Sequence, residues 1–257
     1  MGTLEFGYTF LTLSAIIAAR YFLVAGLFHY ALLSADHPRI YALKLSHRRP
    51  SLPAMKKEIY WSIISSFIYA LPATVVLMLW QNGGTQIYAN IDDYGLVYIP
   101  LSIGLYLFMH DTYFYWTHRA MHLPHLFSFV HKVHHESRPT SPWAAFSFHP
   151  SESLVGAIFL PFLVLFIPLH IGALLFILTL MTVCAVLNHS GYEVIRDSWV
   201  RNGFIGRHFI TATHHNMHHE NYNVNFGLYF RFWDKLMRTD LFDVNNDGLS
   251  GAKDTAK

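Results

Sequence analysis

Eight histidines of this 257-residue chain fall into three short clusters with a regular spacing. The clusters read His-Arg-Ala-Met-His over residues 118–122, His-Lys-Val-His-His over 131–135 and His-Asn-Met-His-His over 215–219. Side chains three or four positions apart share one face of a helix, so each cluster is predicted to direct its imidazoles to one place. Neutral imidazole is a ligand that suits iron and zinc. Because a tetrahedral zinc takes four ligands, eight convergent histidines predict two metal ions in one site.

The other histidines of the chain lack this spacing. A lone histidine is of intermediate burial and is most often an ordinary surface or core residue. That interpretation is applied to His29, His37, His47, His125, His170 and His208. Two interpretations stay open, an ordinary residue or a member of the site, for His110, His149, His189 and His214.

The composition indicates a membrane protein. Hydrophobic residues make up 53% of the chain and charged residues 13%, against about 25% charged in typical soluble proteins. The single cysteine, Cys184, excludes an intramolecular disulfide and a cysteine-based metal site. No basic run interleaved with aromatic residues suggests binding to nucleic acid. The first nineteen residues contain no Lys or Arg, so we expect a spanning helix rather than a signal peptide to direct insertion.

Long apolar stretches give the elements that must position the histidines. A hydrocarbon core of about 30 Å takes about 20 helical residues. Stretches of sufficient length cover residues 8–33, 59–80, 96–116 and 154–188. The last is interrupted at Pro168, His170 and Gly172, which predicts a tight hairpin of two short spans. No linker composition divides the chain, so we expect one all-α membrane domain over residues 1–257.

The placement of charge predicts the topology. The loop 34–58 holds six Lys or Arg residues, whereas the loop 81–95 holds none. All 18 basic residues except Arg20, that is 17, fall on one side of the predicted arrangement. The positive-inside rule makes that side cytoplasmic, and the three histidine clusters lie on it. Arg20 itself is expected to act as an interfacial anchor or to pair with a buried acid.

Several kinds of protein fit a histidine site at the edge of a membrane, where lipid is the accessible substrate. Calcium and magnesium prefer oxygen ligands, so the histidines favour iron or zinc. One candidate is an enzyme that uses two irons and O2 to oxidise a lipid C–H bond. A second is a zinc hydrolase of lipid esters, which needs three protein ligands and an open position. A third is a membrane protein that binds metal without catalysis.

The motifs resemble those of the fatty acid hydroxylase superfamily, particularly its sterol desaturase branch. The segments that carry the resemblance are 111–122, 131–135, 142–150, 188–192, 214–219, 223–227 and 232–236. The resemblance is close over residues 96–240, the expected catalytic region, and extends to the first ninety residues only in hydropathy. The segment 139–150 is similar to sterol-ring desaturases and 188–192 to sterol methyl oxidases, so hydroxylation and desaturation both stay open.

The resemblance implies an integral, multi-pass membrane protein with about four transmembrane helices under a cytoplasmic helical cap, its C-terminus also cytoplasmic. The implied cofactors are two iron ions, for which zinc can substitute in purified protein, with O2 as co-substrate. The implied ligands are His118, His122, His131, His134, His135, His215, His218 and His219, with His189 as a ninth. Because the chain shows no nucleotide-binding fingerprint, we expect the two electrons to come from a separate cytochrome or ferredoxin with its reductase.

Further residues are assigned around these ligands. Some relatives carry a histidine four residues after the position of His189, where this chain has Glu193. Glu193 is expected either to share a helical face with His189 and to bind the metal, or to be a surface acid beside Arg196 with this ligand position lost.

Two acids and two more histidines complete the expected site. Asp111 is expected to orient an imidazole from one helical turn before the first cluster, or to be an interfacial charge. Asp234 is expected to hold a ligand, or to pair with Arg231 or Arg238. Metal-binding imidazoles need oriented partners, so we expect His149 and His214 to lie beside the ligands.

Overall fold

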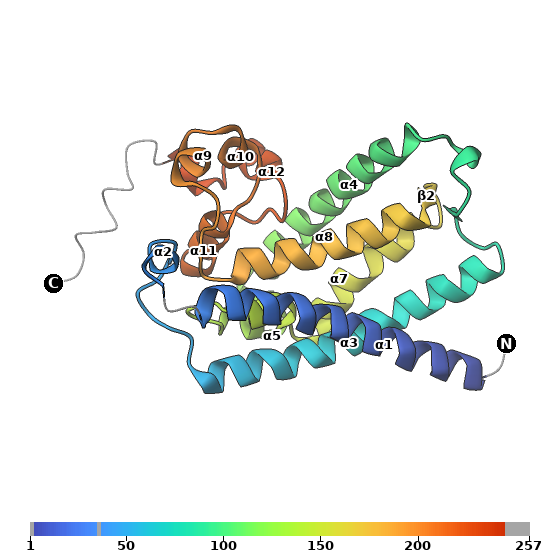
Figure 1. The fold of residues 1–257 in the computed structure, drawn as a ribbon, viewed down its shortest axis with the longest axis horizontal. Helices are drawn as coiled ribbons and strands as arrows, with labels where there is room; N and C mark the ends of the chain where they lie inside the picture. Colours follow the sequence, from blue (N-terminus) through green and yellow to red (C-terminus); the bar gives the residue numbers. More distant parts are fainter. Residues whose placement is uncertain (1–2, 35–36, 245–257) are drawn as a thin grey trace.

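A computed structural model describes residues 3–34 and 37–244 of the chain. Five helices form its body: α1 (Thr3–Phe28), α3 (Leu52–Gln81), α4 (Tyr98–Met121), α7 (Pro150–Leu163) and α8 (Ile171–His189). A π-helical turn, His29–Leu33, extends α1. Figure 1 shows these helices lying lengthwise, with α1 against α3 and α8, and with α4 against α7 and α8. The expected all-α architecture is therefore observed.

The helix boundaries follow local capping. Ser51 accepts a hydrogen bond from the Ala54 amide (3.3 Å), so α3 begins seven residues before the apolar stretch that starts at residue 59. The long apolar stretch 154–188 is divided as predicted, because α7 ends at Leu163 and α8 begins at Ile171. Between them a short strand β2 (Leu169–His170) pairs in parallel with β1 (Ile87–Tyr88), Ile87 opposite Leu169.

Three helices in the described part of the chain are long and apolar enough to cross a membrane: Thr3–Leu33, Leu52–Gln81 and Ile171–His189. At about 1.5 Å per residue, the 14 residues of α7 span about 21 Å, less than a hydrocarbon core. The second half of α4 carries polar side chains, among them His110 and Asp111. Large apolar side chains such as Leu11, Leu23 and Leu175 are exposed on the long helices, as a lipid environment requires. The exact number of spans stays a prediction.

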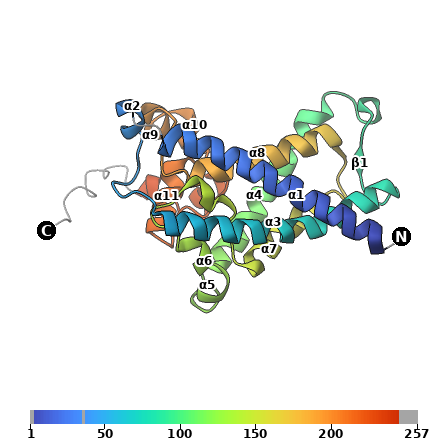
Figure 2. The ribbon, with the colours of Figure 1, turned by 60° about the horizontal axis from the view of Figure 1, so that its bottom comes forward.

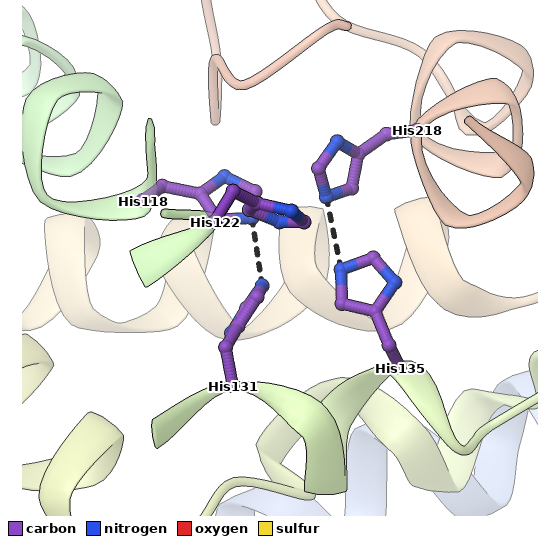
Figure 3. A group of neighbouring side chains, drawn as sticks. All are labelled: His118, His122, His131, His135 and His218. Carbon is purple, nitrogen blue, oxygen red and sulfur yellow. Dashed lines mark hydrogen bonds between the residues drawn. The ribbon is translucent and has the colours of Figure 1, made fainter. Parts of the chain in front are cut away.

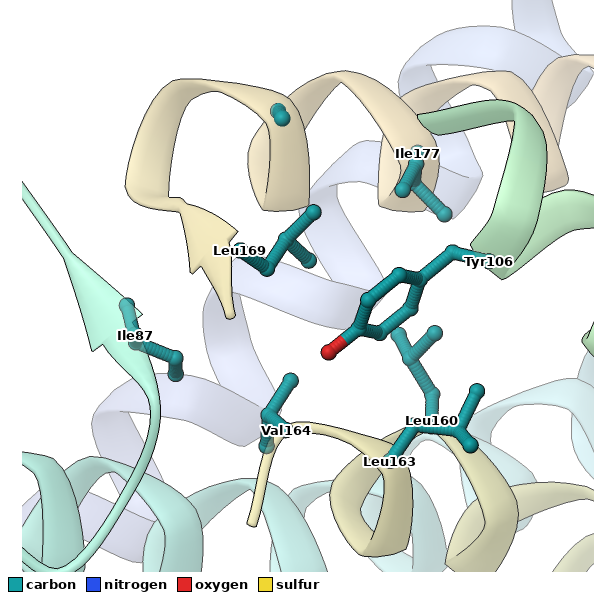
Figure 4. Packing of buried hydrophobic residues seen from close by; sticks show 8 residues of the cluster. Ile87, Tyr106, Leu160, Leu163, Val164, Leu169 and Ile177 are labelled. Atoms are coloured by element: carbon teal, nitrogen blue, oxygen red, sulfur yellow. The ribbon is translucent and has the colours of Figure 1, made fainter. Parts of the chain in front are cut away.

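The core lies between the long helices in two clusters. The first, at the end of the bundle that holds β2, packs Tyr106 of α4 against Leu163 and Ile177 (Figure 4). The Tyr106 hydroxyl donates to the Ile167 carbonyl (2.6 Å). In the second, the Tyr21 hydroxyl of α1 donates to the Trp143 carbonyl (2.9 Å). Trp143 belongs to a 3-10 helix, Pro142–Phe146, so this bond ties α1 to the segment that precedes α7.

Short helices gather at the opposite end of the bundle and form a helical cap. They are α2 (Pro38–Tyr41), α5 (Pro124–Val130), α6 (Lys132–His135), α9 (Asp197–Arg201), α10 (Phe204–His208), α11 (Ala212–Glu220), α12 (Phe232–Leu236) and α13 (Leu241–Val244); a further 3-10 turn, Ile91–Asp93, follows β1. Figure 2 shows α9 and α11 at one end of the molecule and β1 at the other, with α5 and α6 below. Every histidine cluster of the sequence lies at the cap end.

Candidate metal centre

Nine histidines converge at the cap end in two neighbouring groups. The five-histidine group consists of His118, His122, His131, His135 and His218 (Figure 3). The four-histidine group consists of His134, His189, His215 and His219. Within each group, one nitrogen of every ring lies within 4.8 Å of the others, and all of the side chains except His122 are buried. The two groups adjoin, since the ring centroids of His135 and His219 are 4.6 Å apart.

The clusters of the sequence do not each serve one group. On α11, His215 and His219 face the four-histidine group, while His218 faces the five-histidine group. The second cluster is divided in the same way, with His134 separated from its neighbours. The expectation that a cluster points all its imidazoles to one place holds for His118 and His122 but is wrong for the second and third clusters. Residues four apart stay together, and the residue between them turns to the other group, because one turn of helix offers two flanks.

The spacing of the ring nitrogens suits metal ligands. Nε2 atoms lie 3.0 Å apart in His118 and His131, 3.1 Å in His135 and His218, and 2.8 Å in His189 and His215. A metal–nitrogen bond is about 2.0–2.1 Å, so two ligands at angles of roughly 90–110° lie about 2.9–3.4 Å apart. Figure 3 shows the five imidazoles pointing toward one another from the ends of three separate segments.

Hydrogen bonds to backbone carbonyls show where several ring protons lie. Nδ1 of His189 lies 2.7 Å from the Ala185 carbonyl oxygen, and Nδ1 of His134 lies 3.4 Å from that of Ser147. A carbonyl only accepts, so each Nδ1 carries the hydrogen and each neutral Nε2 presents a lone pair. These two Nε2 atoms face each other at 3.1 Å. Two facing lone pairs repel, and a cation shared between them removes the conflict.

A proton is a poor candidate for that cation. Burial, followed by the charges of neighbouring imidazoles, holds the pKa of His134, His215 and His219 well below the usual value of 6.5. These rings are accordingly neutral at neutral pH, the form in which histidine binds a metal. In addition, both ring nitrogens of His122 are buried without a hydrogen-bond partner among the described residues. The donor set therefore fits a pair of metal ions.

One carboxylate contacts the histidines directly, and the sequence interpretation missed it. Oε1 of Glu152, in the first turn of α7, lies 2.7 Å from Nδ1 of His131, and both side chains are buried. A carboxylate behind an imidazole fixes the ring and raises its basicity, an arrangement typical of metal sites. The available signal was an acid three residues after His149 at the start of an apolar helix, a costly position unless the acid has a partner.

The two expected acids act through a loop instead of through an imidazole. Oδ1 of Asp111 accepts hydrogen bonds from the amides of residues 228–230, at 2.7–3.2 Å. The Asp234 carboxylate accepts from the amides of Phe226 and Gly227, both at 2.8 Å. The direct contact that we expected between Asp111 and a ligand imidazole is absent from the described hydrogen bonds.

The loop that these acids hold orients two ligands. The carbonyl oxygen of Phe226 lies 2.9 Å from Nδ1 of His118, and that of Val224 lies 2.7 Å from Nδ1 of His218. Asp111 and Asp234 are thus positioning residues one step removed from the imidazoles. Among the ion pairs of the described residues, none joins Asp234 to Arg231 or Arg238, and Arg231 pairs with Asp240 at 2.7 Å.

Glu193 lies outside both groups. Helix α8 ends at His189, and Gly191 turns the chain with a φ of +75°, a conformation that a residue with a side chain rarely adopts. The prediction that residues 189 and 193 share a helical face is therefore wrong. The Glu193 carboxylate accepts from the amide and the hydroxyl of Thr213 (3.0 and 2.8 Å), so it holds the first turn of α11.

The last two assigned histidines also cap helices. His149 is the N-cap of α7, where its Nδ1 lies 2.7 Å from the Ser151 hydroxyl. His214 forms a capping box at the start of α11, with Nδ1 accepting from the Thr211 amide at 3.2 Å. Neither belongs to a histidine group, although both position segments that lead into one.

The fatty acid hydroxylase family model matches residues 103–239, more than half of the chain. A Delta(7)-sterol 5(6)-desaturase of Gibberella zeae is 31% identical over 70% of this chain, and a lathosterol oxidase of Rattus norvegicus is 29% identical over 71%. A C-4 methylsterol oxidase of Schizosaccharomyces pombe is 34% identical over 54%. The matches cover 55%, 60% and 46% of these relatives.

The fold and the site define a mostly helical membrane protein with two largely buried histidine groups. The chain belongs to the fatty acid hydroxylase family, with sterol desaturases among its relatives, as its motifs predicted. No solved structure matches it.

Proposed function

We propose that the protein is an O2-dependent diiron oxidoreductase that hydroxylates or desaturates a membrane lipid. One observation carries this proposal: nine mostly buried imidazoles form two adjoining groups in which ring nitrogens lie at the spacing of shared metal ligands. One ion would be held by the five-histidine group and the other by the four-histidine group. All nine ligands expected from the sequence are used in this arrangement.

The family supports oxidation of a lipid. The names of the similar proteins describe the desaturation or oxidation of sterols, and the chain resembles both kinds. We infer a lipid substrate of this general type and leave the choice between adding oxygen and removing hydrogen to experiment. Two iron ions bound here would supply the O2-dependent oxidation of a C–H bond, with electrons delivered by a separate cytochrome or ferredoxin and its reductase.

The protein's own residues hold and shield the site. Carbonyl groups of Phe226, Val224 and Ala185 keep Nδ1 of their histidines protonated, so Nε2 of each ring would be free to bind an ion. Glu152 does the same for His131 through its carboxylate. Burial excludes water from the rings, which strengthens the electrostatic contribution of every oriented donor.

The alternatives receive less support. A hydrolytic zinc keeps an open position beside three protein ligands, whereas four histidines fill a tetrahedral zinc. A metal-binding protein without catalysis is compatible with the ligands, but the sterol oxidases and desaturases among the relatives favour catalysis.

We further propose that the cap faces the cytoplasm, since 17 of the 18 basic residues belong to that side of the predicted topology. With Cys184 replaced by alanine, a cysteine at exposed His47 should resist an impermeant thiol reagent in intact cells, and one at exposed Asp92 should react. The reverse labelling would place the site on the other side.

Metal analysis and lipid profiling test the function together. Purified protein should carry two iron ions per chain, and cells that express it should contain a lipid that has gained one oxygen atom or lost two hydrogen atoms. The His134→Ala substitution should abolish formation of the product, whereas His47→Ala, which lies outside both groups, should not. A single zinc with cleavage of a lipid ester would support the hydrolase instead.

A further inference from the structure

A cavity of about 250 Å³ lies at the cap end of α1 and α3, and its lining includes Ser190, the residue after His189. Apolar side chains from the helix ends form one part of its lining, including Leu33 and Met55. Basic side chains of the connection between α1 and α3 form another part: Lys44, Arg48 and Arg49. The cavity is thus amphipathic, and it lies where the spanning helices end.

The basic segment is held in place. Its backbone runs beside residues 191–193, with the Leu45 amide donating to the Gly191 carbonyl (3.0 Å) and the Glu193 amide donating to the Leu43 carbonyl (2.8 Å). The guanidinium of Arg49 donates to the Tyr41 hydroxyl. It also lies 5.4 Å from the centroid of the Tyr41 ring, and the Lys44 ammonium lies 5.9 Å from the same centroid. One aromatic ring therefore orders two of the three cations.

The positive charge of the cavity is not neutralised by the described chain. Over residues 3–34 and 37–244, the ion pairs involve other cations, and none includes Lys44, Arg48 or Arg49. Three like charges without an acidic partner favour an anion, which accepts from all of them.

We propose that this cavity binds the anionic head group, a phosphate or carboxylate, of a membrane amphiphile. Its volume is below the roughly 300–1,000 Å³ of pockets that enclose whole small molecules, so it suits a head group with the attached chain leaving along the apolar side chains. The wall formed by Ser190, Gly191 and Tyr192 directly follows His189, so a bound amphiphile would lie beside the four-histidine group. This inference goes beyond the proposed oxidation and does not depend on turnover.

Calorimetric titration of the full chain in a neutral detergent tests the site with three probes. Dihexanoyl phosphatidic acid carries the phosphate and the chains, dihexanoylglycerol carries the chains alone, and inorganic phosphate carries the charge alone. We expect phosphatidic acid to bind one molecule per chain and at least ten times more tightly than either of the others. Equal binding of dihexanoylglycerol would overturn the anionic site, and equal binding of inorganic phosphate would overturn the amphiphile.

Variants locate the binding. Arg48→Gln combined with Arg49→Gln should weaken phosphatidic acid binding at least tenfold, whereas Arg196→Gln combined with Arg207→Gln, an equal change of charge outside the cavity, should not. The single variant Arg48→Gln, at an exposed side chain, should weaken it several-fold even if the double variant fails to fold. Unchanged affinity in the Arg48 variant would overturn the location. Iron content, measured on the same samples, separates this result from any failure of the proposed oxidation.

Discussion

The two histidine groups contain the same kind of side chain but are supported by different parts of the fold. In the five-histidine group, His118 relies on the Phe226 carbonyl, 108 residues away, and His131 relies on the Glu152 carboxylate. In the four-histidine group, His189 relies on the Ala185 carbonyl of its own helix. The five-histidine group therefore includes support from distant segments and from a buried carboxyl group, whereas His189 of the four-histidine group is held by the helix that carries it.

This difference predicts that the two groups respond unequally to change outside the imidazoles. The loop 224–230 illustrates the point. A side chain on Gly227 would place its Cβ 2.5 Å from the Phe230 carbonyl oxygen, so the loop tolerates little alteration without moving. Movement of this loop would displace the carbonyls that orient His118 and His218, both of the five-histidine group.

The largest expected effect comes from removing a ligand from each group in turn. His218→Ala and His215→Ala should each lower lipid oxidation by more than about 100-fold. Each variant should keep about one iron per chain, because only the ion of the altered group loses an imidazole. Iron analysis and product formation measure both. His170→Ala, at the opposite end of the bundle, is the matched control. Full activity and two irons in His218→Ala would end the diiron proposal.

Acid should destabilise the metal-free protein. The pKa values of His134, His215 and His219 are lowered by burial, so below about pH 6.5 the unfolded chain takes up protons that the folded chain does not. Each histidine should then cost up to about 1.4 kcal/mol of unfolding free energy per pH unit, or about 4 kcal/mol for three. Thermal melting of the chelator-treated protein at pH 7.5 and 5.5 measures this. An unchanged melting temperature would show that these rings are not buried as neutral groups.

Glu152→Gln should act on one group only. Loss of the carboxylate behind His131 should weaken iron binding by the five-histidine group by about 10–100-fold, and the four-histidine group should keep its ion. Glu220→Gln, an exposed acid at the end of α11, is the control. Iron retention during titration with a chelator would resolve the two ions. Equal loss of both would show that the groups are not independently supported.

The smallest effect is expected for Glu193→Gln. It removes charge-assisted bonds to Thr213 at the first turn of α11 and should lower the unfolding free energy by about 1 kcal/mol, with bound iron unchanged. Chemical denaturation and iron analysis measure the two quantities. Loss of an ion without loss of stability would return Glu193 to the metal site.

The sequence by itself determined which side chains would meet and at what kind of surface. The spacing of the histidines and the lengths of the apolar stretches can be interpreted with the geometry of a single helix. The clustering of residues 118–122 and 131–135 could therefore be predicted without the fold. The break near Pro168 was readable for the same reason, because proline and glycine act on their own backbone.

The tertiary structure decided which group each ligand joins and what lies behind it. His134 and His218 belong to a different group from their cluster neighbours, and this division depends on how α6 and α11 pack against the other segments, which no local spacing contains. Glu152 reaches His131 across 21 residues, and Asp111 reaches the loop 228–230 across more than a hundred. Such contacts depend on long-range packing, whereas the sequence reports chiefly the periodicity and the composition of each segment.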